Sequence, residues 1–534
     1  MRRSRGTATR CWTPVACACA AILLSAQSVQ AQTARTASAA QTFDIEAYDV
    51  DGVTLLKQGD VEAAVYPFEG PGRTRGDIDH AREALEKVYH DRGLQTVVVE
   101  LPPQSVSDNI VRLHVIEAPV GRLRVTGSRY FSPNAIRNEA PAFREGQVPD
   151  LNAAQAELAD LNRLPDRRIT PLLRAGAIPG TVDVELKVSD TLPLHGSVQV
   201  TNDHNADTPP LRVLSTLHYD NLWQLGHSLS FTYAVAPQDR AASEIFAGSY
   251  LAPLWGTRWN LMLYGYDSNS NVATLGGTNV LGKGYAFGLR AILQLPRKGD
   301  VAQSVSFGID LKNFDENITF GSTSTADTIR YLPVNFVYTL QGDGPRVSGK
   351  ATLGVTAGLR GLGGDTAIFQ NKRANANPNF VHLNLDISDT VALGGGFEMN
   401  NRLSGQIADQ PLVSSEEFAA GGLSSVRGYL QSEVVGDDGL TGSFEFRSPS
   451  LAPRLGAFVD DFRFFGFADG GVVRVLHPLA GQTDFFSLAS AGLGLHAQLL
   501  KHLDGYVLGA VPLIEGPNTR RYRPEIFFTV NADF

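Results

Sequence analysis

The strongest constraint on the fold is an alternation of apolar and polar side chains that begins near residue 194 and continues to the end of the sequence. In the final segment every second side chain is apolar: Ile526, Phe528, Val530, Ala532 and Phe534. Residues 194–201 and 228–235 alternate in the same way. A period of two is typical of β-strands with one apolar and one polar face. The sequence therefore predicts an all-β region over residues 192–534.

This β region could form a water-soluble sandwich or a membrane barrel, because the strands of both alternate. After residue 31 no apolar run reaches the roughly 20 residues of a membrane helix. In lipid only helices and closed barrels pair every backbone group, so a membrane-embedded form of this region must be a barrel. Its length, its aromatic residues near strand ends and its terminal Phe534 favour a transmembrane antiparallel β-barrel of about 16 strands.

The N-terminus has the features of a secretory signal over residues 1–31: four arginines, an apolar stretch at 11–26, and small residues up to Ala31. The alternative, a membrane anchor, needs a longer apolar run. Residues 32–42 form a short linker. All three cysteines precede residue 31, so the exported chain has no thiol. The net charge is -9 and the signal is basic, so the exported chain is acidic and nucleic acid is not an expected partner.

Two small α+β domains are predicted between the linker and the β region, over residues 43–118 and 119–191. Each has helically spaced apolar residues followed by two strands, which indicates a tandem repeat of one β-α-β-β unit. In the first domain we expect a helix at 77–92 and strands at 96–101 and 109–117. In the second we expect a strand at 122–126, helices at 134–140 and 151–164, and strands at 168–174 and 181–188.

Two motifs in the last quarter of the chain point to a site inside the barrel. The tetrapeptide Val426, Arg427, Gly428, Tyr429 lies in a Gly- and Ser-rich loop, and Phe467, Asp469 and Gly471 form a Phe-x-Asp-x-Gly pattern on a strand. Alternation places Asp469 on the presumed lumenal face. A buried carboxylate needs a partner, and arginine offers a two-pronged one. We therefore expect the loop to fold back so that Arg427 meets Asp469, with Gly428 in a tight turn and the Tyr429 hydroxyl in water. The alternative is a solvated loop cation and an ordinary turn acid.

On these motifs, their order and the terminal Phe534, the chain resembles the two-partner secretion (TpsB) transporters of the ShlB/FhaC/HecB type, haemolysin secretion/activation proteins with POTRA domains. Further matches are residues 161–165 (Leu-Asn-Arg-Leu-Pro) and 179–183 (Pro-Gly-Thr-Val-Asp) in the second α+β domain, and 101–104 (Leu-Pro-Pro-Gln) in the first. The resemblance implies periplasmic POTRA domains and a barrel in the outer membrane of a Gram-negative bacterium. It also implies that the Val-Arg-Gly-Tyr loop lies inside the barrel, and that Phe534 ends the barrel as its C-terminal signal.

The function implied by the resemblance is export of an unfolded partner polypeptide, encoded by an adjacent gene, without nucleotide. The other implied partners are outer-membrane lipid and the barrel assembly machinery that inserts the chain. Many family members carry an N-terminal helix that plugs the pore. Only residues 32–42 precede the first strand here, so we expect this helix to be missing or rudimentary.

POTRA domains of the resembling family bind extended segments along a sheet edge, a form of β-augmentation. Pro171 suits an edge strand, because proline cannot donate to a central ladder. We therefore expect docking edges near residues 168–174 and 95–101, with four candidate residues: Val97, Val99, Ile169 and Leu172.

Other site types have little support in the sequence. His204, His218 and His227 lack the close spacing of metal ligands, so no metal is expected. The Gly-rich stretches lack the lysine of a phosphate loop, and no hydrolase or metalloprotease motif is present, so we expect neither a cofactor nor an enzyme. Two alternative functions stay open: a barrel assembly factor, which shares the loop motif, and a passive porin.

Overall fold

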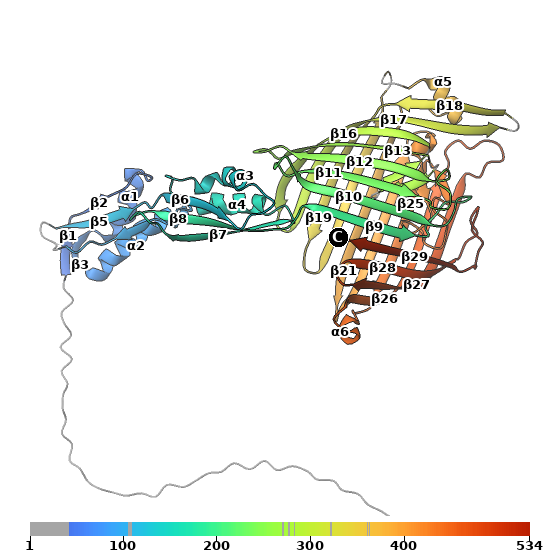
Figure 1. Cartoon of the computed structure of the whole chain (residues 1–534). Helices are drawn as coiled ribbons and strands as arrows, with labels where there is room; N and C mark the ends of the chain where they lie inside the picture. Colours follow the sequence, from blue (N-terminus) through green and yellow to red (C-terminus); the bar gives the residue numbers. More distant parts are fainter. Residues whose placement is uncertain are drawn as a thin grey trace, which may run out of the picture. The chain divides into compact units, whose positions relative to one another are not determined.

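The computed structural model of the chain describes residues 42–104, 109–269, 272–275, 278–281, 283–320, 323–359, 361 and 364–534 (Figure 1). The predicted signal at 1–31 and residues 32–41 of the predicted linker lie outside these residues. Contacts divide the chain into two compact units, residues 1–117 and 118–534. The described part of the first unit is one α+β domain, and the second unit holds another α+β domain and a barrel. Within the described residues, no helix is long and apolar enough to cross a bilayer.

The first α+β domain is a three-stranded sheet with two helices and a short additional pair of strands. Its strands are β1 (Thr42–Ile45), β2 (Ala47–Asp51), β3 (Gly70–Thr74), β4 (Val98–Glu100) and β5 (Ile110–Ile116), and its helices are α1 (Gln58–Val65), η1 (Tyr66–Phe68) and α2 (Arg75–Asp91). The sheet order is β2-β5-β4, and β1 pairs with β3. A capping box between Thr74 and Asp77 starts α2, which buries Ile78, Ala81 and Leu85. The predicted helix and the two strands after it are present; one strand was predicted before the helix, without bounds, where the structure has β1, β2, α1 and β3.

The second α+β domain repeats this design. It contains β6 (Val120–Thr126), α3 (Pro133–Asn138), η2 (Pro141–Phe143), α4 (Leu151–Leu161), β7 (Arg167–Ala175) and β8 (Val182–Asp190), with sheet order β6-β8-β7. In both domains the central strand pairs in parallel with the first strand of the sheet and antiparallel with the second. The shared topology explains why the two segments give similar sequence patterns.

Both predicted docking strands, β4 and β7, lie at the edge of their sheets. Three of the four side chains named as docking candidates point into the domain cores: Val97, Val99 and Ile169 are at most 3% exposed, and only Leu172 is exposed, at 37%. Alternation along an edge strand turns every second side chain into the core, so these three residues could meet a partner only through their backbone, and the docking edges stay a prediction. What an edge strand offers a partner is its backbone.

The β region closes into an antiparallel barrel. Its strands are β9 (Leu194–Thr201), β10 (Arg212–Leu222), β11 (His227–Val235), β12 (Glu244–Pro253), β13 (Trp259–Ser268), β16 (Lys283–Lys298), β17 (Val301–Phe320), β18 (Thr323–Tyr331), β19 (Pro333–Asp343), β20 (Val347–Gly358), β21 (Val381–Gly394), β22 (Phe397–Ala408), β25 (Asp438–Arg447), β26 (Val459–Arg474), β27 (Phe485–Leu499), β28 (Leu503–Pro512) and β29 (Glu525–Asp533). One half of β17 pairs with β19 and the other half with β18, so β18 and β19 are two parts of one strand of the wall. The predicted barrel of about 16 strands is confirmed.

The barrel wall is apolar outside and polar inside. Large side chains such as Phe231, Phe287 and Leu493 are exposed on the outer face, whereas ion pairs such as Arg290 with Asp310 lie on the inner face. This is the arrangement that a lipid-embedded barrel requires.

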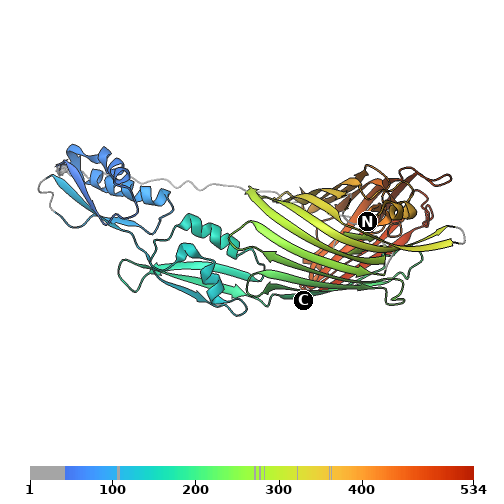
Figure 2. The same cartoon turned by 90° about the horizontal axis from the view of Figure 1, so that it is seen from above.

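The two ends of the barrel differ in the length of their connections (Figure 2). We call the end at which β9 leaves the second α+β domain the proximal end, and the opposite end the distal end. Proximal turns are mostly short, for example 299–300 and 344–346. Distal loops include 359–380, which carries α5 (Thr366–Lys372), and 409–437. In outer-membrane barrels short turns face the periplasm and long loops face the cell exterior.

The barrel closes between its last and first strands. Strand β29 pairs with β9 from Thr529 with Thr201 to Asp533 with Ser197. The backbone N–H of Phe534 donates to the carbonyl of Gly196 at 2.9 Å. A Cβ at residue 196 would come within 2.1 Å of the Phe534 ring, so glycine makes room for it. The structure thus places the terminal phenylalanine over the closing seam.

In the first domain, the ionisation state of one carboxyl group should affect the free energy of unfolding of the domain. Glu117 accepts hydrogen bonds from the backbone N–H groups of Thr54 and Leu55, both at 2.9 Å, and from the Tyr89 hydroxyl at 2.8 Å. Partial burial raises the pKa of Glu117, but these hydrogen bonds outweigh it and hold the pKa below its ordinary value. A depressed carboxyl pKa adds stability above the pKa of the unfolded chain, and this stability is lost as the pH falls.

We predict that Glu117→Gln lowers the free energy of unfolding of the first domain by about 1–2 kcal/mol at pH 7, because the hydrogen bonds lose their charged acceptor. The difference from the unaltered domain should begin to shrink as the pH falls below about 4.3, the pKa of an unfolded glutamate, and should vanish only below the lowered pKa of the folded state. Urea unfolding of a fragment spanning residues 42–118, with and without the substitution, measures this difference in the free energy of unfolding. Glu83→Gln, at an exposed site on α2, is the matched control and should have little effect. A difference that does not depend on pH would contradict this role of Glu117.

Candidate functional site

The distal loop at residues 409–437 connects β22 with β25 and folds into the barrel. It contains η3 (Ser414–Glu416) and a two-stranded ribbon formed by β23 (Phe418–Ala420) and β24 (Val434–Gly436). Between these strands the tip of the loop is largely buried against the inner wall, including Gly421, Val426 and Tyr429. The loop therefore occupies part of the lumen.

Arg427 is the centre of the contact between the loop and the wall. Its Nε donates to Asp469 Oδ2 at 2.7 Å, its Nη2 donates to Oδ1 at 2.8 Å, and its backbone N–H donates to Oδ2 at 3.0 Å. The Arg427 guanidinium carbon lies 3.7 Å from the centroid of the Phe467 ring, within cation–π distance. Arg427 is 4% exposed and Asp469 is 5% exposed. The structure thus brings Arg427, Phe467 and Asp469 together, as the sequence analysis expected.

Two further groups on β25 complete the arginine's environment. Arg427 Nη1 donates to Glu445, and Nη2 also donates to Ser443 Oγ at 2.9 Å. Glu445 is shared with Arg447, whose Nε donates to it at 2.8 Å. Neither Ser443 nor Glu445 was predicted from the sequence. Alternation places both residues on one face of a single strand, which is the signal that the sequence contains. Only the register between strands, which pairs Ser443 with Asp469, shows that this face meets the same site.

The neighbours of Arg427 fix the loop by packing. Val426 is fully buried in a cluster with Val473 and Leu488 of the wall. Gly428 has φ +94°, a left-handed conformation that favours glycine, and a Cβ there would lie 3.1 Å from the Ala510 Cβ. A Cβ at Gly471 would come within 2.9 Å of Thr441 and 3.2 Å of Val426. The glycines of both motifs therefore allow close approach of loop and wall.

Tyr429 differs from the expectation. Its side chain is buried, and its hydroxyl lies 2.8 Å from the Ile514 carbonyl and 2.9 Å from the Ala489 carbonyl, where it was expected in water. Because the loop folds deeply against β27 and the loop at 513–524, backbone carbonyls replace water as the partners. Tyr429 thus ties the tip of the loop to the distal side of the barrel.

Three buried acids hold the rest of the loop. Glu416 accepts from Lys312 Nζ and the Tyr331 hydroxyl, both at 2.6 Å, and lies 3.2 Å from His382 Nε2. Asp437 accepts from the backbone N–H groups of Leu412 and Leu476, each at 2.6 Å. Glu433 accepts from the N–H groups of Asn518 and Thr519 at 2.6 and 2.8 Å. None of these acids was predicted from the sequence, because their partners lie on distant strands and loops.

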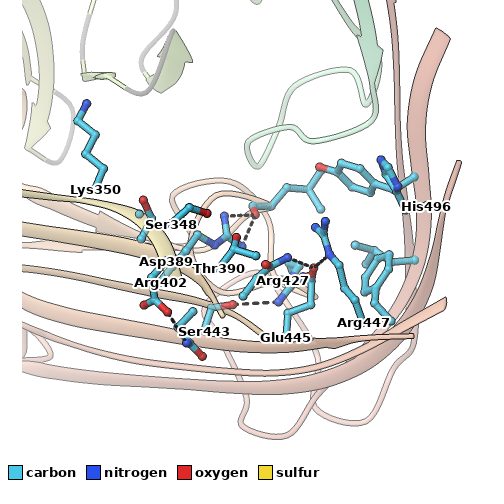
Figure 3. A pocket seen from close by; sticks show the side chains of 18 of the residues that line it. Ser348, Lys350, Asp389, Thr390, Arg402, Arg427, Ser443, Glu445, Arg447 and His496 are labelled. Carbon is cyan, nitrogen blue, oxygen red and sulfur yellow. Dashed lines mark hydrogen bonds and ion pairs between the residues drawn. The ribbon is translucent and has the colours of Figure 1, made fainter. Parts of the chain in front are cut away.

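A polar cavity of about 510 Å³ adjoins this contact. Figure 3 shows Arg427, Ser443, Glu445 and Arg447 close together, with Arg402 and Lys350 further along the cavity. The lining carries both signs of charge. The arrangement can hold a loop reversibly, because water can replace each of its polar contacts.

Comparison with protein families gives two matches. The model of the haemolysin secretion/activation protein ShlB/FhaC/HecB matches residues 180–497, and the model of the ShlB-type POTRA domain matches residues 43–118. The first match covers more than half of the chain. Both motifs of the lumenal contact lie within it.

Individual proteins show the same relationship. The outer membrane transporter CdiB of Dickeya dadantii is 24% identical over 404 residues, 72% of this chain and 69% of that protein. The hemolysin transporter protein ShlB of Serratia marcescens is 24% identical over 79% of this chain and 76% of that protein. Among solved structures, CdiB from Escherichia coli has a TM-score of 0.63 at 18% identity, covering 94% of this chain and 92% of that chain. BamA from Haemophilus ducreyi lacking POTRA domains 1-3 has a TM-score of 0.56 at 14% identity, covering 93% and 100%. At these identities the structures show a shared fold.

The geometry predicts unequal roles for the two carboxylates on Arg427. Asp469→Asn should free the loop, because Asp469 accepts three hydrogen bonds from Arg427 and breaking a buried ion pair costs about 3–5 kcal/mol. Glu445→Gln removes the charge from an acceptor of one such bond and should cost about 1–2 kcal/mol. We expect Ala420→Cys, fully buried in the ribbon, to react with a water-soluble maleimide about 100-fold faster in the Asp469→Asn background.

The control for this labelling is Ser424→Cys, at an exposed position of the loop tip, which should react in every background. The predicted signal contains every native cysteine, so the introduced thiol would be the single one in the exported chain. Equal labelling of Ala420→Cys in the Asp469→Asn and Glu445→Gln backgrounds would show that the two carboxylates hold the loop equally.

Proposed function

Because the chain belongs to the ShlB/FhaC/HecB family of haemolysin secretion/activation proteins, we propose that it exports one secreted partner polypeptide in an unfolded state. The chain is an outer-membrane transporter of two-partner secretion, with its POTRA domains in the periplasm. The proximal end of the barrel is therefore the entrance and the distal end is the exit. The partner is proposed to be the product of an adjacent gene, and the proposed transport includes no enzymatic reaction, cofactor or nucleotide.

The observation that supports this proposal best is the lumenal loop held by Arg427. A loop that occupies part of the lumen must shift before the barrel can pass a polypeptide, and a contact made of charged hydrogen bonds can be exchanged for water or for groups of the cargo. We infer that loosening of the contact between Arg427 and Asp469 opens the conduit. Folding of each emerging stretch at the cell surface would prevent its return and so drive the transfer.

A second closure lies at the distal end. The loop at 359–380 contributes Phe369 and Phe380 to an apolar cluster with Phe314 and Tyr331 of the inner wall and Leu412 of the lumenal loop. Apolar side chains that gather inside a polar lumen exclude water from that part of the lumen and so hinder the passage of ions. We propose that this cluster, together with the loop at 409–437, closes the resting barrel. Residues 32–41, where a plug helix was not expected, lie outside the described residues.

The proposed docking edge is the part of β7 that no other group already covers. Pro171 has no N–H, and its neighbours two positions away on the strand share its orientation toward the free edge. The edge-facing N–H and carbonyl of Ile169 already have hydrogen-bond partners. The Asn162 side chain accepts from this N–H at 2.6 Å and donates to this carbonyl at 3.1 Å. Beyond the carbonyl of Pro171, the next edge groups without a hydrogen-bond partner among the described residues are those of Leu173. We infer that a passing segment pairs with the backbone from Leu173 onward.

The export role of the lumenal contact predicts that Arg427→Ala strongly reduces the amount of partner in the medium while the barrel stays inserted. Asp469→Ala should act alike, and the double variant should add little, because both changes remove one interaction. Co-expression with the adjacent-gene product measures export, and outer-membrane fractionation measures insertion. Arg454→Ala, on the exposed helix α6 (Ala452–Leu455), is the matched control. Normal export by an inserted Arg427→Ala variant would refute the role.

Depletion of the protein separates the proposal from its two alternatives. Loss of one secreted product supports export. A broad loss of outer-membrane proteins would identify a barrel assembly factor, and a loss of solute uptake alone would identify a porin.

The docking edge predicts that Leu173→Pro reduces export, because proline removes the free N–H that a partner strand would use while the ladder to β8 keeps its hydrogen bonds. Leu173→Ala is the control: it removes the same half-exposed side chain but keeps the N–H, and it should export normally. Secreted partner is quantified for both variants. Equal loss in both would mean that the side chain, and not the backbone edge, matters at this position.

A further inference from the structure

Two histidines meet at the proximal mouth of the barrel, where the chain passes from the second α+β domain into the wall. His195 on β9 and His218 on β10 are directly paired across the two strands, and their ring centroids are 4.9 Å apart. Leu194, Val198 and Leu217 are exposed on the outer face, so alternation turns both histidines toward the lumen. Asp220 follows on the same face of β10. One ligand atom from each of His195, His218 and Asp220 lies within 4.8 Å of the other two.

A buried carboxylate orients one of these histidines. Asp166, 5% exposed and located between α4 and β7 of the second α+β domain, has its Oδ2 2.9 Å from His195 Nε2. Its other oxygen accepts from Thr191 Oγ1 at 3.2 Å. A carboxylate that holds one nitrogen of a histidine ring fixes the tautomer and leaves the other nitrogen as a ligand, which is the usual arrangement behind metal-binding histidines.

The second histidine has a carboxylate beside it. Asp220 Oδ2 lies 3.3 Å from His218 Nε2, and Asp220 Oδ1 accepts from Ser228 Oγ at 2.7 Å. The His195, His218 and Asp220 side chains are 33%, 39% and 17% exposed, so water and ions can reach them. Oriented imidazoles beside a carboxylate, facing an aqueous lumen, form a donor set with space in front of it.

We infer that His195, His218 and Asp220 form a binding site for a divalent transition metal ion, with Zn²⁺ as the best match. Two imidazole nitrogens and one carboxylate oxygen suit zinc, whereas Ca²⁺ and Mg²⁺ prefer sets made of oxygen alone. Three protein ligands leave a fourth position for water. Zinc bonds of about 2.0–2.2 Å require the three ligand atoms to move closer together, which rotation of the half-exposed rings allows.

The site would connect three elements. A bound ion would join β9 to β10 beside the closing seam of the barrel, and through His195 and Asp166 it would also stiffen the joint to the second α+β domain. No metal was predicted from the sequence, in which His204, His218 and His227 lack the close spacing of metal ligands. The structure pairs His204 with the Asn202 carbonyl and His227 with the Tyr250 hydroxyl, while His218 meets His195, which the sequence analysis did not consider.

The test is Zn²⁺ titration of the whole mature protein in detergent, purified with a tag that contains no histidine, in competition with a chromogenic chelator. We expect one tight site per chain. His195→Gln and His218→Gln should each weaken it at least about tenfold, and Asp166→Asn, which removes the orienting carboxylate, should weaken it about 10- to 100-fold. His114→Gln is the matched control, because His114 faces Asp51 at 2.7 Å but has no second histidine in its site. It should leave zinc binding unchanged.

A second measurement keeps the inference testable if a variant does not assemble. Co²⁺ added to the unaltered protein should give the visible absorption of a tetrahedral site, and Zn²⁺ should displace it in a ratio of one per chain. Absence of this absorption, or zinc binding that His195→Gln and His218→Gln in assembled barrels leave unchanged, would overturn the assignment.

Discussion

The contact on which the rest of the structure depends is the buried pairing of Arg427 with Asp469 inside the barrel. Removing a guanidinium from water costs several kcal/mol, and it is compensated only where every donor finds an acceptor. Here the arginine meets two carboxylates, one hydroxyl and an aromatic face. Because the wall supplies all of these groups, the loop has one position that satisfies them, and that position decides which part of the lumen stays open.

The remaining contacts of the loop follow the same principle with the charges reversed. Glu416, Glu433 and Asp437 point from the loop to cations, hydroxyls and backbone N–H groups on other elements. The loop is thus anchored at its base, along its ribbon and at its tip by polar contacts, with apolar clusters around Leu412, Leu423 and Val426. Polar contacts can be exchanged one by one, so the loop can be firmly placed at rest and still be displaced. An entirely apolar interface would have to separate as a whole.

The features that could be predicted from the sequence are those whose pattern lies within a short segment of the chain. Alternation is local, so the barrel and its approximate size were predictable, and helical spacing revealed α2. The strands β1–β3 are too short for a period, and α1 has few apolar residues at helical spacing. The pairing of Arg427 with Asp469 was predictable because a buried acid on an alternating strand needs a cation. Ser443, Glu445 and the pairing of His195 with His218 depend on the register between strands, which one sequence does not specify. Tyr429 was placed in water because the depth of the loop was not known.

The edge strand β7 must avoid stable pairing with other folded proteins and still bind a passing segment transiently. A free edge attracts other strands and risks aggregation, so proteins shorten or block it. In β7 the Asn162 side chain covers the groups of Ile169, and Pro171 has no N–H to offer. What stays free is the stretch from Leu173 onward, too short for a stable pair with another folded sheet. An unfolded cargo segment needs only a few such bonds at a time, since it is bound and released repeatedly. The partly blocked edge can therefore disfavour stable pairing with a folded sheet and still bind an unfolded cargo segment transiently.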